Sequence, residues 1–189
     1  AVPGCAPRPM PPKAALIRPS RGHYGICRPG PIGTPIADDR GAAGDPIPYS
    51  MPMRFHILAV DYDGTLAEDG VVKESTVESL RRCKSSGRRL VLVTGRRLEP
   101  LLEIFSHLDL FDLVVAENGG LLYFPGTGEE RLLCEPPPDH FVDTLIRRGV
   151  PDVEVGRSIV ATWTPHENTV LETIRDLALE LQIIFNKGA

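Results

Sequence analysis

The fold is decided by residues 55–66, which read Phe-His-Ile-Leu-Ala-Val-Asp-Tyr-Asp-Gly-Thr-Leu. Residues 57–60 form a continuous apolar run rich in branched side chains, which is typical of a strand buried on both faces of a parallel sheet. The run ends at two carboxylates, Asp61 and Asp63. Because open α/β sheets bind ligands at the carboxyl ends of their strands, we expect these two acids to belong to a functional site.

Two carboxylates one residue apart repel each other unless a cation or a shared proton relieves the repulsion. Asp61 and Asp63 therefore favour a divalent metal, and hard oxygen ligands favour Mg²⁺. Gly64 and Thr65 follow at once and predict a turn that carries a hydroxyl. The alternative interpretation is that residues 61–64 are only a strand followed by an Asp/Gly turn, since these residue types dominate turns.

Two later segments have the same pattern of an apolar run followed by polar or small residues. Residues 90–93 (Leu-Val-Leu-Val) precede Thr-Gly-Arg, and residues 113–116 (Leu-Val-Val-Ala) precede Glu-Asn-Gly-Gly. Helical patterns separate the three apolar runs; the first opens with a capping box, Ser-Thr-Val-Glu at 75–78, and the second has proline in its first turn. Strands that alternate with helices predict right-handed parallel crossovers and a doubly wound, Rossmann-like α/β sheet.

The polar residues after the second and third runs are candidate ligand-binding groups. A strand parallel to the first would bring the Thr94 hydroxyl and the Gly95 N–H towards Asp61, as a cradle for phosphate oxygens. Asn118 is placed to touch a substrate or to brace the site. As alternatives, Thr94-Gly95 is an ordinary strand-to-helix turn, and Asn118 is a turn residue.

Three stretches resemble motifs of the haloacid dehalogenase superfamily: Asp-Tyr-Asp-Gly-Thr-Leu at 61–66, Val-Thr-Gly-Arg at 93–96 and Glu-Asn-Gly at 117–119. The last is similar to an element of the Cof-like class IIB branch, where it marks the exit into a cap domain inserted after the third strand. The resemblance implies a Mg²⁺-dependent phosphatase that works through an aspartyl-phosphate.

Roles follow from the resemblance residue by residue. It implies that Asp61 is the nucleophile, that Asp63 is the general acid and then base, and that both belong to the metal site. It implies that the phosphate or substrate contacts come from Gly64, Thr65, Thr94, Gly95, Arg96 and Asn118. By resemblance to the cap type, the substrate is a small phosphomonoester such as a sugar phosphate.

The pattern changes after Gly120. Residues 121–124 and 131–134 read as a β-hairpin, and helical patterns begin at Asp139 and at a second capping box, Thr-Pro-His-Glu at 164–167. Further strands are predicted at 153–155, 158–163 and 183–185. This order suggests a small α+β cap over 119–189, separate from the core over 53–118, that would exclude water from the site.

The first 52 residues differ from the rest of the chain. They hold 12 of the 19 prolines, and no apolar periodicity of a helix or a strand runs through them. A segment of this composition buries too little apolar surface to offset its ordering entropy, so we expect disorder over 1–52. The segment is interpreted as translated upstream sequence or a dispensable tail.

Composition narrows the choice of partners. The net charge of −4 gives no basic face for nucleic acid, and no apolar run is long enough for a membrane span. The four cysteines have no CxxC spacing and fit reduced thiols in a cytoplasmic protein. The expected partner is therefore a small phosphomonoester.

The resemblance also implies two motifs that do not follow within the sequence: a lysine that neutralises the phosphate, and an acidic pair that completes the metal site. The sequence is therefore interpreted as a C-terminally truncated enzyme with little activity and an exposed apolar strand edge. Two other functions stay open. One is a phospho-accepting receiver domain, against which the predicted cap counts; the other is a catalytically dead interaction fragment.

Overall fold

The computed structural model describes residues 13–17 and 55–186. The three apolar runs form strands β2 (Ile57–Asp61), β5 (Arg89–Val93) and β6 (Leu113–Ala116), and β5 pairs in parallel with both of the others. Helix α1 (Glu74–Ser85) connects the first pair, and α2 (Leu98–Ile104) with the short turn η1 (Leu108–Leu110) connects the second. The predicted parallel sheet is confirmed.

Both helices cover the same face of this sheet. Val77 of α1 and Leu101 of α2 are buried in one apolar cluster with Leu90, Leu92 and Val114. Right-handed crossovers that step in one direction across a sheet place their helices on the same face of that sheet. A helix on the other face requires a crossover to a strand on the far side of β2. No helix in the described part of the chain covers that second face, where the side chains of Ile57 and Val93 are 61% and 40% exposed.

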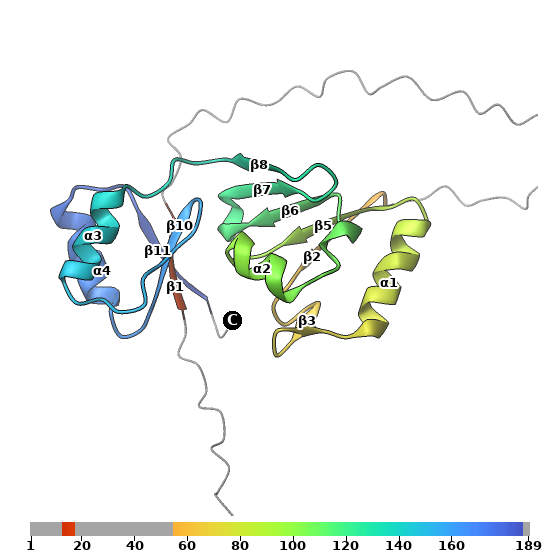
Figure 1. Cartoon of the computed structure of the whole chain (residues 1–189), viewed down its shortest axis with the longest axis horizontal. Coiled ribbons are helices and arrows are strands. Elements are labelled where there is room, and N and C mark those ends of the chain that lie inside the picture. The colour runs from red at the N-terminus through yellow and green to blue at the C-terminus, as the bar shows by residue number, and fades with distance from the viewer. Residues whose placement is uncertain (1–12, 18–54, 187–189) are drawn as a thin grey trace, which may run out of the picture. The chain divides into compact units, whose positions relative to one another are not determined.

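The predicted hairpin consists of β7 (Leu121–Phe124) and β8 (Glu129–Leu132). It belongs to the first sheet and not to the second domain, because β7 pairs antiparallel with β6 and the strand order is β2-β5-β6-β7-β8 (Figure 1). This corrects the expected boundary after residue 118. The reason is the turn η2 (Glu117–Gly119), whose positive φ angles reverse the chain and return it beside β6.

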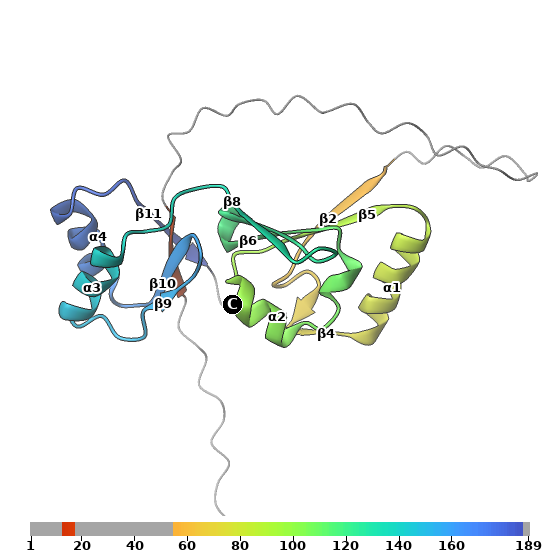
Figure 2. The same ribbon diagram turned by 45° about the horizontal axis from the view of Figure 1, so that its top comes forward.

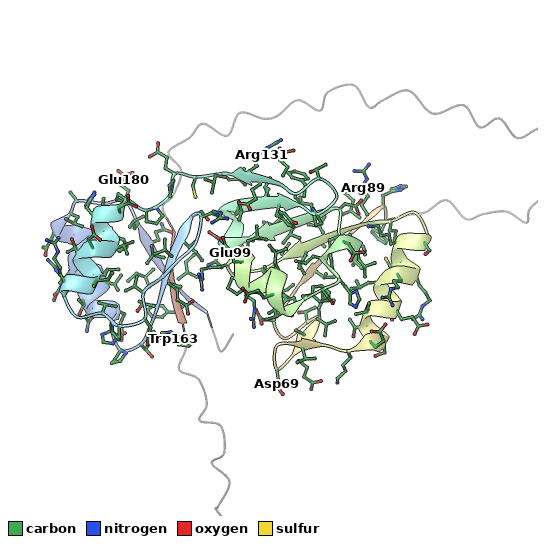
Figure 3. The ribbon with its side chains drawn as sticks, in the orientation of Figure 1. Asp69, Arg89, Glu99, Arg131, Trp163 and Glu180 are labelled. Atoms are coloured by element: carbon green, nitrogen blue, oxygen red, sulfur yellow. The ribbon has the colours of Figure 1, made fainter. Side chains whose placement is uncertain are left out.

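A small flap follows β2. Strands β3 (Ala67–Glu68) and β4 (Val71–Val72) form a two-stranded hairpin, with Asp69 at its tip (Figure 3). Asp69 and Gly70 have φ angles of 51° and 78°, the left-handed conformation that allows a tight turn between the two strands. The hydroxyl of Tyr62 donates a 3.2 Å hydrogen bond to the Gly70 carbonyl, and this bond ties the flap to the end of β2.

The second sheet contains β9 (Glu154–Val155), β10 (Ile159–Trp163) and β11 (Gln182–Asn186), together with helices α3 (Asp139–Arg147) and α4 (Glu167–Asp176). The two helices lie side by side on one side of this sheet in Figures 1 and 2. Their shared apolar cluster is Phe141, Leu145, Val150, Val160, Val170 and Ile174. This α+β layer agrees with the sequence-based expectation for the later part of the chain.

An additional strand, β1 (Lys13–Ile17), also belongs to the second sheet, which has the order β11-β1-β10-β9. The expectation of disorder over residues 1–52 is corrected for these five residues. The sequence concealed the strand because a five-residue run between prolines is too short to show a periodicity. The remaining residues of that segment lie outside the described part of the chain.

None of the helices in the described ranges is long and apolar enough to cross a membrane.

Candidate active site

The first candidate element is the turn at the end of β2. Asp61 is the last residue of the strand and is exposed, whereas the side chain of Tyr62 is completely buried. The Gly64 N–H donates a 3.0 Å bond to the Ala67 carbonyl, and Gly64 has a φ angle of 72°. The buried Tyr62 anchors this turn, and the acids on either side of it are held at the edge of the sheet.

The second element is the end of β5. The register pairs Asp61 with Val93, so Thr94 follows directly beside the end of β2. Thr94 is 2% exposed, and its N–H donates a 2.9 Å bond to the Val115 carbonyl. Its Oγ1 accepts a 3.1 Å bond from the Arg96 N–H, which leaves the Thr94 hydroxyl proton available for an acceptor.

The end of β6 is the third element, and it is bonded to the second. The Asn118 N–H donates to the Thr94 carbonyl at 3.3 Å, and the Glu117 N–H donates to the Arg96 carbonyl at 3.0 Å. Asn118 has a φ angle of 54°, a left-handed conformation that asparagine tolerates better than most residues. Its Nδ2 is buried and has no hydrogen-bond partner among the described residues.

Arg96 connects the second element to the first. Its Nε lies 3.1 and 2.9 Å from the two carboxylate oxygens of Asp63, and its Nη2 lies 2.7 Å from Asp63 Oδ1. The guanidinium also lies 5.2 Å from the centre of the Tyr62 ring. The hydrogen bonds to Asp63 raise the pKa of Arg96, and burial raises the pKa of Tyr62.

The expected site residues thus lie on three neighbouring strand ends. Asp63 and Arg96 are in direct contact, and Thr94 and Asn118 are joined through the backbone. Thr65 is exposed, and the Gly64 N–H is used within its own turn. Arg96, expected to contact phosphate, contacts the Asp63 carboxylate in the structure. The sequence concealed this pairing because 33 residues separate the partners.

Comparison with known proteins agrees with this arrangement. The model of the haloacid dehalogenase-like hydrolase family matches residues 58–140, which include all three strand ends. Over these residues the chain is similar to the haloacid dehalogenase-like hydrolases.

Two curated relatives are named phosphoglycolate phosphatase. The relative from Metallosphaera sedula is 35% identical over 94 residues, which cover 48% of this chain and 41% of the relative. The relative from Pyrobaculum islandicum is 40% identical over 85 residues, which cover 43% and 36%. The chain therefore spans less than half the length of these relatives.

A solved haloacid dehalogenase-like hydrolase from Bacteroides thetaiotaomicron is 24% identical to the chain. The match covers 50% of this chain and 36% of that protein, with a TM-score of 0.44.

The oxygen atoms at these strand ends are of the kind that Mg²⁺ binds. In the described ranges, no group of three or more His, Cys, Asp or Glu side chains could hold a metal ion. Within the same ranges, the Asp61 carboxylate accepts one hydrogen bond, from the Tyr62 N–H at 2.9 Å. Mg²⁺ usually keeps several waters and takes one or two carboxylates together with substrate phosphate. The exposed Asp61 carboxylate fits a site of that open kind.

Glu117, a residue for which no role was predicted, is completely buried beside Asn118. Its Oε1 accepts a 3.0 Å bond from the Arg157 N–H, and its Oε2 accepts bonds from the N–H and hydroxyl of Ser158 at 2.6 and 2.8 Å. The sequence offered one signal for a role of Glu117, its position directly after the strand β6. The partners of Glu117 could not be predicted, because they lie 40 and 41 residues away in the sequence.

Two ion pairs accompany the Glu117 contacts. Arg157 Nη1 lies 2.6 Å from Oε1 of Glu99 on α2, a residue labelled in Figure 3. Arg97 Nη2 lies 3.0 Å from Oε2 of Glu154 on β9. The start of α2 and the end of β6 therefore both contact the loop and strand that precede β10.

Proposed function

We propose that the chain carries the nucleophile and the phosphate-binding residues of a phosphatase that hydrolyses small phosphomonoesters. The observation that carries the proposal is the exposed Asp61 carboxylate at the end of a parallel strand, in register with the residue before the buried Thr94. The family match over residues 58–140 and the phosphatase names of the curated relatives support it.

Asp61 is the proposed nucleophile. One of its carboxylate oxygens attacks phosphorus, the bond between phosphorus and the ester oxygen breaks, and an aspartyl-phosphate forms. Asp63 gives a proton to the departing alkoxide. Water then attacks the same phosphorus, Asp63 takes a proton from that water, and the bond from Asp61 to phosphorus breaks to release inorganic phosphate.

Arg96 controls access to Asp63 in this scheme. While the guanidinium binds both oxygens of the Asp63 carboxylate, Asp63 is not free to transfer a proton. A substrate phosphate is a competing partner for the same guanidinium, because Arg binds phosphate through the same planar fork. Movement of Arg96 from Asp63 to the phosphate would therefore hold the substrate and free the Asp63 carboxylate to take up a proton from solvent, which Asp63 then gives to the leaving alkoxide.

The remaining phosphate contacts are assigned to donors without a full set of partners. The hydroxyl proton of Thr94 and the Nδ2 of Asn118 are two such donors on adjacent strand ends. Gly95 and Thr65 complete the proposed set, and the backbone at Gly95 allows a close approach. Donors fixed by strand ends stabilise the transferring phosphoryl group without reorganisation.

The proposed metal is Mg²⁺, which hard oxygen ligands favour. In this chain, the Asp61 carboxylate and the Asp63 backbone carbonyl would hold the ion. When bound, it neutralises negative charge that builds up on the phosphoryl oxygens. Removal of the metal with EDTA is expected to abolish phosphate release, and added Mg²⁺ is expected to restore it.

The test is phosphate release from p-nitrophenyl phosphate, 2-phosphoglycolate and a hexose phosphate in the presence of Mg²⁺. Each is measured with the full chain. Asp61→Asn is expected to reduce turnover by at least about 10³-fold, since the amide is a poor nucleophile. Asp109→Asn, which neutralises an exposed acid in η1, is the control and is expected to leave turnover unchanged. Retained turnover in Asp61→Asn would contradict the proposal.

A further inference from the structure

Strand β1 fills a position in the middle of the second sheet. All five of its residues pair antiparallel with β10 on one side and with β11 on the other: Lys13 lies opposite Trp163 and Asn186, and Ile17 lies opposite Ile159 and Gln182. Because neighbouring strands lie about 4.8 Å apart, β10 and β11 are separated by about two strand spacings, and β1 fills the space between them. We call this space, which has the width of one strand, the groove.

The two strands that flank this groove, β10 and β11, depend on β1 for their pairing to different extents. In the described part of the chain, β11 pairs with no strand other than β1. Strand β10 keeps a second neighbour, β9, but only through the pairs of Val160 with Val155 and Ala161 with Glu154. Without β1, both sides of the groove would present rows of unpaired N–H and C=O groups, which is the surface that an added strand recognises.

The groove also has an apolar floor. Val160 of β10 is completely buried in the cluster under α3 and α4, and Ile183 of β11 packs against the same cluster. Both residues lie opposite Leu16 of β1. A strand in this position is therefore matched by backbone pairing on two sides and by apolar residues beneath, which favours an extended segment with an apolar residue at the Leu16 position.

The sequence around β1 limits the ligand to a short segment. Pro12 directly precedes the strand, and Pro19 follows two residues after it. Proline cannot donate to a ladder, so the pairing segment cannot extend far in either direction. Lys13–Ile17 and β2 belong to one chain, with residues 18–54 between them, so the segment pairs within its own molecule and a free peptide must compete with a covalently linked strand.

We propose that the groove between β10 and β11 is a strand-binding site whose ligand is this chain's own Lys13–Ile17 segment. The segment is an internal ligand that a free peptide of the same sequence can replace. A free peptide competes with it only at high concentration, or when the internal strand is broken. The proposal does not depend on the phosphatase activity.

The test compares the full chain with Ala15→Pro, which removes one N–H from β1. Hydrogen exchange is followed at the amides of β10 and β11, with the amides of β5 and β6 as the internal reference for the first sheet. Ala15→Pro is expected to speed exchange in β10 and β11 by at least about tenfold and to leave β5 and β6 unchanged. Ala42→Pro is the matched control, since it adds a proline between β1 and β2, and it is expected to change neither sheet.

A synthetic peptide with the sequence of residues 12–19 is then added to Ala15→Pro at millimolar concentration. It is expected to restore slow exchange in β10 and β11, whereas a scrambled peptide is expected to have no effect. Unchanged exchange in Ala15→Pro, or no restoration by the peptide, would overturn the proposal.

Ala14→Pro is a second variant that helps to distinguish the loss of β1 pairing from a general failure to fold. Successive residues of a strand direct their N–H groups to opposite neighbours, so this variant breaks the pairing on the other side of β1. If both variants also expose β5 and β6, the strand is an obligatory part of the fold and the proposal fails. It fails too if the wild-type chain is a dimer whose β11 protection falls on dilution, because the strand would then come from a second copy.

Discussion

At the scale of single residues, the contact between Arg96 and Asp63 leads to the first prediction. Arg96→Lys keeps the positive charge but replaces a planar fork with a point charge. If Arg96 transfers from Asp63 to the substrate phosphate, this variant is expected to raise KM for p-nitrophenyl phosphate by roughly tenfold, with a smaller effect on kcat. Arg88→Lys, a change of the same kind on the surface before β5, is the control. An unchanged KM would contradict the transfer of Arg96.

Tyr62 gives a prediction about pH. Burial raises the pKa of its phenol above the ordinary value of 10.0, so the folded state favours the neutral side chain. The stability that Tyr62 contributes is thus fully present below pH 10 and is lost as pH rises through the higher pKa of the folded state. Urea unfolding is expected to show falling stability above pH 10. Tyr62→Phe is expected to reduce this slope and to cost about 1 kcal/mol at pH 8, because the bond to the Gly70 carbonyl is lost.

Gly156 packs against the buried carboxylate of Glu117 and leads to a third prediction. A Cβ at Gly156 would lie 2.8 Å from both carboxylate oxygens of Glu117. Gly156→Ala is therefore expected to destabilise the chain by about 1–3 kcal/mol in urea unfolding. Gly126→Ala is a matched control, because nothing lies within 4 Å of a Cβ there, and its effect is expected to stay within about 0.5 kcal/mol. Equal effects of the two variants would count against a tight contact with Glu117.

At the scale of elements, β5 has one protected face and one open face. Leu92 is completely buried against the helices, whereas the side chain of its neighbour Val93 is 40% exposed on the face that no described helix covers. Leu92→Ala is expected to cost about 2–5 kcal/mol, and Val93→Ala less than about 1 kcal/mol. Urea midpoints of the two variants check this difference, and similar losses would show that the second face is covered in solution.

The sequence predicted those strands that a continuous apolar run marks. Residues 57–60, 90–93 and 113–116 formed the expected parallel strands, but residues 57–59 are exposed and the expected burial on both faces is corrected for β2. The two capping boxes failed. Helices α1 and α4 follow Lys73 and His166, and neither has a side-chain cap. Burial of the apolar face fixes where these helices begin, and this outweighs the smaller energy of a cap.

The unpredicted parts of the candidate site all depend on distant partners. The Asp63–Arg96 pair, the acceptor role of Glu117 and the place of β1 each join segments that are far apart in sequence. The closeness of Asp61 and Thr94 could be predicted because Asp61 is the last residue of β2 and Thr94 directly follows β5, and the parallel register places these two strand ends together. Local pattern thus located the strand ends, while long-range contacts decided which side chains meet there.

At the scale of the whole molecule, the first sheet has both an open face and an open edge. Strand β2 pairs only with β5 among the described strands, and its Ile57 side chain is 61% exposed. An apolar edge strand is a template for pairing with another chain. We therefore predict that the chain self-associates through β2 as its concentration rises, and that Ile57→Lys weakens this association.

The net charge of the chain opposes the predicted effect of Ile57→Lys on self-association. The net charge is −4, so an added lysine brings it closer to zero, and a smaller net charge by itself promotes association. Weaker association of Ile57→Lys in sedimentation velocity must then come from the blocked edge. Ile104→Lys makes the same change on α2, where the side chain is 48% exposed, and it is expected to leave association unchanged or stronger. If both lysine variants weaken association equally, β2 is not the contact.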